Sequence, residues 1–174
     1  MNILRQTGYL SARSFTIRYH QPLTRRFIRT GAPKMESIPV VTYGRRAEIA
    51  TAIQKLLLPE YDVVHIILDL PTALHEIPLI LTLTPPSPAS TLGTNAARAA
   101  ANEPLRTPKA VIFGGGIPDE EVAQVKAAVS EEQRGEVLWV NLTMEDYARQ
   151  GVQQGPSPPV ANVLVREKLR EGGL

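Results

Sequence analysis

The most constraining feature of the sequence is the alternation, from residue 35 onward, of short apolar runs with longer segments of helical periodicity. Four runs rich in Val and Ile have the length and composition of β-strands: residues 37–43, 61–69, 109–113 and 136–142. The second run is apolar almost throughout, as expected for a parallel strand that is buried on both faces. Strands joined in this way by helices predict a three-layer α/β/α fold with a four-stranded, mainly parallel sheet.

Helices are expected between the strands and at the C-terminal end. In residues 45–57, Ile49 and Ile53 recur at helical spacing and place one apolar face toward the core. A short helix after residue 71 is expected to be limited by Pro78, because proline has no backbone N–H to donate. Further helices are predicted after residue 117, at 143–147 and at 159–171. This order of elements is that of a small Rossmann-like or flavodoxin-like domain.

Residues 1–34 differ sharply in composition from the rest of the chain. They contain six arginines and one lysine but no acidic residue, which is typical of a mitochondrial transit peptide. Arg25, Phe27 and Thr30 also resemble the processing pattern of matrix-targeted leaders, and that pattern implies a mature start at Met35 and a location in the mitochondrial matrix. The alternative is that Met35 is the initiator, residues 1–34 are an upstream extension or a disordered tail, and the protein is cytoplasmic.

Residues 35–174 have the size of one domain and carry 12 basic against 17 acidic residues, a net charge of −5. An acidic body argues against a nucleic-acid partner. The apolar runs are far shorter than the roughly 20 residues that a membrane span needs. The absence of cysteine and of suitable histidine spacing gives no reason to expect a metal site. Within the domain, residues 84–108 are rich in Pro, Ala and small polar residues and are predicted to form a long flexible loop.

The expected site lies at the edge of the sheet where the strands end. Ligands of open parallel sheets bind beyond the carboxyl ends of the strands. The candidate ligand-binding residues at the four strand ends are Thr42, Gly44, Arg45, Arg46, Asp69, Gly114, Gly115, Asn141 and Thr143.

The glycines at 114–116 have the look of a phosphate-binding turn, but the residues after them argue for a structural role. Pro118 has no amide to donate, and the carboxylates at 119–121 both satisfy the positive end of the next helix and repel a phosphate. The third glycine of a dinucleotide fingerprint is also replaced, by Asp119. We interpret this stretch as a tight turn at the end of the third strand. The glycines would leave space for a ligand that is held by other residues to approach the backbone.

The two arginines after Gly44 have the opposite electrostatics. They open a helix, where each exposed cation is disfavoured by about 0.3–1 kcal/mol. A small anionic ligand would offset this cost. The alternative is that the arginines point to solvent or form ion pairs with Glu48, Glu36 or Asp69.

The stretch "VTYGRRAEIATAI" is similar in layout to the opening of short-chain dehydrogenases. The resemblance implies a strand, a glycine turn and a helix that bind NADP, with Gly44 as the first glycine and Asp69 at the position of the acid that contacts the adenine ribose. Glu48 and Ala50 replace the other two glycines, and no Tyr-x-x-x-Lys pair of that family is present. The dehydrogenase active site is therefore missing.

Two further resemblances concern the whole domain. The element order is similar to that of response-regulator receivers, but Gly44 and Gly114 stand where receivers carry the acids for phosphorylation. The stretches "LLPEYDVVHI", "LGTNA" and "AVIFGGG" resemble small uncharacterised α/β proteins from fungal genomes, which implies a fold but no activity.

Two functions from different classes follow. The first is a noncatalytic α/β module that binds a protein partner, or a small anionic ligand or nucleotide, at the carboxyl edge of the sheet. The second is an enzyme with a degenerate Rossmann motif that uses NADP or another phosphate-bearing cofactor, with Asn141 or Thr143 near the reacting group. The sequence shows no catalytic pair, no G-x-S-x-G motif and no P-loop, which favours the first function.

Overall fold

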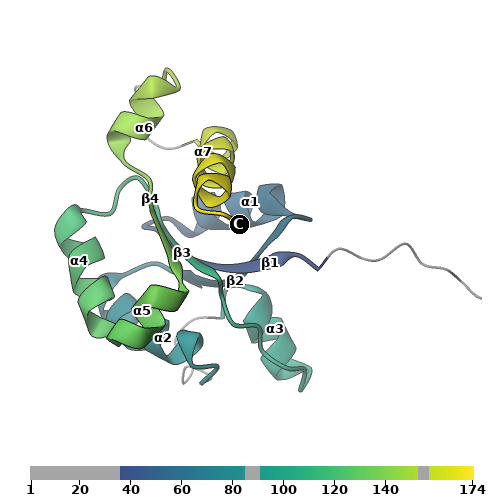
Figure 1. Cartoon of the computed structure of the whole chain (residues 1–174). Helices are drawn as coiled ribbons and strands as arrows, with labels where there is room; N and C mark the ends of the chain where they lie inside the picture. Colours follow the sequence, from purple (N-terminus) through teal and green to yellow (C-terminus); the bar gives the residue numbers. More distant parts are fainter. Residues whose placement is uncertain (1–35, 85–90, 153–156) are drawn as a thin grey trace, which may run out of the picture. The chain divides into compact units, whose positions relative to one another are not determined.

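The computed structural model describes residues 36–84, 91–152 and 157–174 (Figure 1). The predicted transit peptide at 1–34 lies outside these ranges. The strands are β1 Ile38–Tyr43, β2 Tyr61–Ile67, β3 Ala110–Phe113 and β4 Leu138–Asn141. The helices are α1 Ala47–Leu57, α2 Leu70–Leu81, α3 Thr94–Ala100, α4 Asp119–Ala128, α5 Glu131–Glu136, α6 Met144–Arg149 and α7 Pro158–Glu171.

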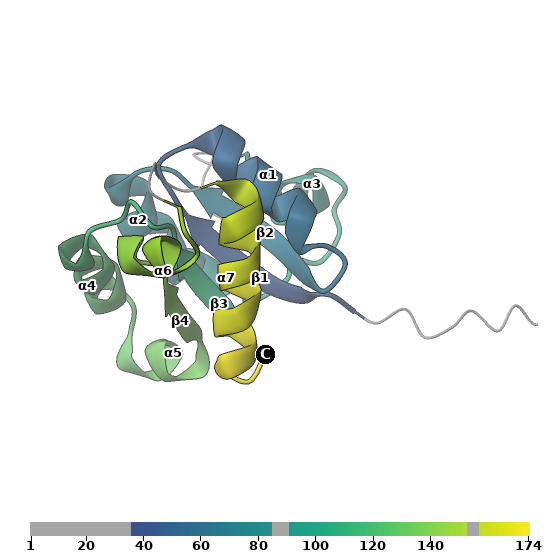
Figure 2. The same ribbon diagram turned by 90° about the horizontal axis from the view of Figure 1, so that it is seen from above.

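The four strands form one parallel sheet in the order β2-β1-β3-β4. Helices cover both faces: α1 and α7 lie on one side of the sheet, and α2 and α4 lie on the other (Figures 1 and 2). Side chains alternate along β1, so that Val40 packs into the core beneath α1 and α7, whereas Val41 packs into the core beneath α2 and α4. The predicted three-layer α/β fold is confirmed.

The prediction that Pro78 limits the helix after Pro71 is wrong. Helix α2 continues through Pro78 to Leu81. Its N-terminus is fixed by Asp69, whose carboxylate accepts hydrogen bonds from the backbone N and the hydroxyl of Thr72, both at 2.9 Å. The buried side chains Ile77 and Ile80 hold the turns on either side of the proline against the sheet. Tertiary packing thus outweighs the local cost of the missing backbone hydrogen bond.

The predicted long flexible loop at 84–108 contains a helix, and the segment after this helix is held in place by hydrogen bonds. Helix α3 packs on the edge strand β2, and the Asn95 side chain exchanges two 3.0 Å hydrogen bonds with the backbone of Arg106. The Arg106 guanidinium in turn donates to Asp62 Oδ2 of β2 at 2.7 Å. Short alanine-rich segments carry little periodicity, so the sequence did not reveal the long-range polar contacts of Asn95 and Arg106.

The predicted strand at 136–142 begins two residues later than expected, because α5 precedes it. Ser130 caps this short helix by accepting a hydrogen bond from the backbone N of Gln133.

In the described parts of the chain, no helix has the length and apolar character that crossing a membrane requires.

Candidate functional site

The carboxyl ends of β1 and β3 form the point from which the chain winds in opposite directions. β1 is followed by β2 on one side, whereas β3 is followed by β4 on the other. The two strand ends lie close together here, since the Gly114 amide donates to the Tyr43 carbonyl at 2.8 Å. Open parallel sheets form a ligand crevice at such a point. A cavity of about 90 Å³ opens there, lined by Gly44, Arg45, Arg46 and the glycines at 114–116.

The interior of this cavity is apolar. It extends beneath the glycines between Ile49 and Ile53 of α1, Ile112 of β3 and Val165 of α7. Its volume is several times the roughly 10–15 Å³ that one water molecule needs. The cavity therefore suits the apolar part of a small molecule better than a single buried water.

The lining also includes the hydroxyl-bearing residues Thr42 and Tyr147, besides Tyr43. Thr42 lines the cavity, and its Oγ1 is buried without a hydrogen-bond partner among the described residues. Leaving such a group unpaired costs about 1–3 kcal/mol. Tyr147 also lines the cavity, and burial raises the pKa of its hydroxyl to about 12, so that it stays protonated at neutral pH. A bound molecule with a polar group would give these hydroxyls partners.

Gly115 explains how Tyr147 comes to lie there. The ring of Tyr147 packs so closely on Gly115 that a Cβ at this position would lie 2.9 Å from Tyr147 Cδ2 and closer still to Cε2. The second glycine of the "GGG" stretch is thus required for close packing. At the neighbouring Gly116, no atom of the described residues lies within 4 Å of the Cβ position.

The N-terminus of α1 borders the same cavity and has no side-chain cap. Arg46 occupies the cap position and makes no capping hydrogen bond. The first hydrogen bond of the helix runs from the Ala50 amide to the Arg46 carbonyl, at 3.1 Å. Consequently the amides of residues 47–49 have no hydrogen-bond acceptor among the described residues. Free amides together with the helix dipole favour an anion at this position.

The two arginines differ in their partners. Arg45 Nη2 pairs with Glu121 Oε1, while Tyr43 donates its hydroxyl hydrogen bond to Glu121 Oε2. Arg46 is exposed and has no ion-pair partner in the described part of the chain. The expected ion pairs with Glu48, Glu36 or Asp69 are therefore wrong, whereas the expectation that the arginines point to solvent holds for Arg46. The acid that neutralises Arg45 comes instead from the run that follows the glycines, 76 residues away.

The structure divides the predicted site residues among three places. One set lines the cavity at the strand crossover: Thr42, Gly44, Arg45, Arg46, Gly114 and Gly115. Asn141 and Thr143 line a neighbouring hollow of about 360 Å³ that shares Gly115 with the cavity. Asp69 lines neither of them, because its carboxylate caps α2. The nine residues therefore do not form one cluster.

The side chains of the two predicted site residues that line the hollow are engaged in hydrogen bonds. The Thr143 hydroxyl is engaged in a capping box with Asp146, in which it contacts the carboxylate at 3.0 Å. Asn141 Nδ2 donates to Asp119 at 2.9 Å. No group of three potential ligand side chains that could hold a metal occurs among residues 36–84, 91–152 and 157–174.

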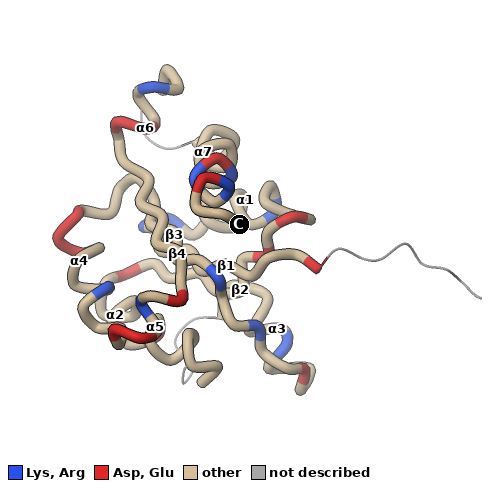
Figure 3. Tube along the Cα trace, in the orientation of Figure 1, with Lys and Arg blue, Asp and Glu red and all other residues tan. Residues whose placement is uncertain are grey.

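Sequence reasoning missed three residues that shape the site. Tyr147 and Val165 come from α6 and α7, far along the chain from the arginines, and Glu121 belongs to the acidic first turn of α4 (Figure 3). The acidic run is a visible signal in the sequence, where it predicts a favourable helix start and repulsion of a phosphate but no ion pair with Arg45. The acidic run lies close to Arg45 because β1 and β3 are neighbouring strands of the sheet.

Comparison with known proteins gives one distant relative. The chain is 33% identical over 118 residues to "Kojic acid related protein 6" of Aspergillus oryzae, and the match covers 68% of this chain and 66% of the relative. No family model matches the chain. No solved structure matches it either. A fungal relative agrees with the resemblance to fungal proteins, whereas the resemblance to short-chain dehydrogenases stays a prediction.

Proposed function

We propose that the protein is a noncatalytic module that binds a small anionic molecule with an apolar body at the crossover between β1 and β3. The observation that carries the proposal is the uncapped N-terminus of α1, with unpaired Arg46, at the mouth of an apolar cavity. The anionic group would accept hydrogen bonds from the amides of residues 47–49 and pair with Arg46. The apolar part would enter between Ile53 and Val165, within reach of the Tyr147 hydroxyl.

The same geometry argues against an NADP-type enzyme. Asp69, which the resemblance to dehydrogenases assigned to the adenine ribose, is engaged in capping α2. The side chains that line the cavity include no carboxylate, histidine or lysine. The neighbouring Glu121 carboxylate is held by Tyr43 and Arg45. Binding without chemistry is therefore the function that these residues support best.

Ligand-dependent thermal stability tests the proposal. The panel comprises phosphate, phenyl phosphate, NADP(H), NAD(H), FMN and ATP, together with kojic acid because the relative carries that name. A compound present at 100 times its dissociation constant stabilises the fold by about 2.7 kcal/mol, which raises the melting temperature measurably. We expect at least one anionic compound with an apolar part to do so.

The variant Arg46→Ala is expected to remove most of that shift, because it deletes the unpaired cation at the cavity mouth. Lys55→Ala is the matched control, since it removes the same charge from the last turn of the same helix. Equal shifts in the two variants would place the ligand elsewhere. A panel in which no compound moves the melting temperature would contradict the proposed function.

A further inference from the structure

Glu121 holds a position at the ligand site that its own helix does not require. Asp119 and Glu120 already place negative charge in the first turn of α4. Glu121 instead extends toward β1, where its two oxygens accept hydrogen bonds from the Tyr43 hydroxyl and from Arg45. Its side chain is only 17% exposed, against 45% for Arg45. A carboxylate is thus fixed beside the cavity by two donors.

Tyr43 is suited to hold this carboxylate permanently. Burial, followed by the hydrogen bond to Glu121, raises the pKa of the Tyr43 hydroxyl, which therefore remains a donor at every physiological pH. The ring of Tyr43 is buried and packs edge-on against Phe113 at a centroid distance of 6.0 Å. The Arg45 guanidinium lies 5.9 Å from the centre of the same ring. Tyr43 therefore organises both partners of the ion pair.

Arg45 lies between the cavity and Glu121. It lines the cavity, yet its charge is already neutralised by Glu121. An anion that enters the cavity meets Arg46 without a competitor but has to compete with a fixed carboxylate for Arg45. A singly charged carboxylate ligand offers Arg45 no more charge than Glu121 does. A dianionic phosphate offers more charge, and its three terminal oxygens match the three free amides of residues 47–49.

We propose that Glu121 is an internal competitor for Arg45 which a dianionic phosphate monoester displaces, whereas a monoanionic carboxylate binds with the Arg45–Glu121 pair intact. This inference rests on the proposed function and specifies its ligand class. Glu121 remains bonded to Tyr43 after the exchange, while Arg45 turns from α4 to the bound phosphate. Binding would then break the ion pair that joins the start of α1 to the start of α4.

The test compares three probes of similar size by calorimetry: phenyl phosphate, the monoanionic diester methyl phenyl phosphate, and benzoate. The full chain is expected to bind phenyl phosphate at least about tenfold more tightly than either monoanion. Glu121→Gln removes the competing charge but keeps an amide oxygen for Tyr43. In this variant phenyl phosphate no longer has to displace Glu121, so we expect its affinity to rise about tenfold. Benzoate and the diester, which do not displace Glu121 in the wild type, are expected to gain less, so that the preference for the dianion widens.

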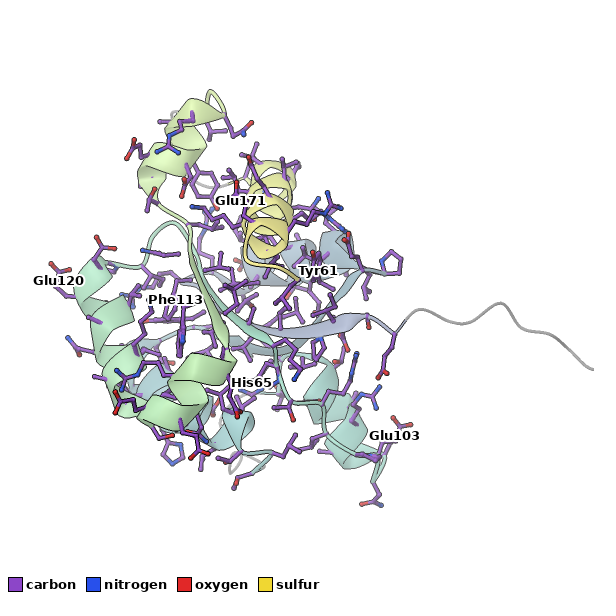
Figure 4. All side chains as sticks on the ribbon, in the orientation of Figure 1. Tyr61, His65, Glu103, Phe113, Glu120 and Glu171 are labelled. Atoms are coloured by element: carbon purple, nitrogen blue, oxygen red, sulfur yellow. The ribbon has the colours of Figure 1, made fainter. Side chains whose placement is uncertain are left out.

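Glu120→Gln is the matched control. It removes the same charge from the adjacent residue, whose exposed side chain points outward from α4 (Figure 4). The control is expected to keep the wild-type preference. If both variants change the three affinities equally, or if wild type binds benzoate as tightly as phenyl phosphate, the competitor role is wrong while the binding function stands. Failure of all three probes to bind any variant would overturn both proposals.

Discussion

Replacing Asp62 with alanine is expected to lower the free energy of unfolding by about 3–5 kcal/mol, a large part of the stability of a domain this size. Asp62 accepts hydrogen bonds from Arg106 at 2.7 Å and from the Thr94 hydroxyl at 2.9 and 3.0 Å. The side chains of Asp62 and Arg106 are 8% and 12% exposed. Removing the acid leaves a buried guanidinium without its main counter-charge, and the exposed Glu36 at 3.5 Å cannot replace it.

Urea denaturation of the variant measures this loss, and Glu103→Ala provides the control. Glu103 pairs with Arg98 at 3.3 Å, but both side chains lie at the surface, and Figure 4 shows Glu103 at the outer end of the segment. An exposed ion pair of this kind contributes at most about 1 kcal/mol. Similar midpoints for the two variants would show that the Asp62–Arg106 pair does not anchor the connection between α3 and β3.

Gly93→Ala is expected to cost about 2–5 kcal/mol for two reasons that act together. Gly93 has a φ of +108°, a conformation that residues with a side chain rarely adopt. The added Cβ would also lie 2.6 Å from the His65 Cα and closer still to the Val64 carbonyl oxygen. Both neighbours are backbone atoms of β2, which cannot move without disturbing the sheet.

Gly151→Ala separates the two contributions to that cost. Gly151 has a φ of +75°, but no atom of the described residues lies within 4 Å of its Cβ position, so that only the backbone strain counts here. We expect this control to lose about 1–2 kcal/mol in the same urea experiment. Equal losses at the two positions would mean that the close approach of residue 93 to β2 contributes nothing to stability.

The sheet was predictable because its signals are local. Four β-branched runs separated by helical periodicities fix the element order, and the carboxyl edge follows from parallel pairing. The cavity residues from β1 and β3 were predictable for the same reason. Three features were not predictable: the continuation of α2 through Pro78, the helix α3, and the ion pair between Arg45 and Glu121. Each of them depends on packing or polar contacts between residues that are far apart in the sequence.

The glycines at 114–116 show which features the neighbouring sequence can predict and which it cannot. The sequence correctly indicated a turn between β3 and α4. It did not indicate that the ring of Tyr147 packs on Gly115, or that Glu121 forms an ion pair with Arg45. Both contacts depend on which strand lies next to which, and the order of the strands is a property of the fold.

The central claim is that the N-terminus of α1 receives the anionic group of the ligand. Titration of the isotope-labelled protein with phenyl phosphate, followed by amide NMR, tests it most directly. The account predicts saturable shifts of the amide signals of Ala47, Glu48 and Ile49 together with those of Gly115 and Gly116. Saturable shifts confined to another part of the domain, with these five signals unchanged, would contradict it.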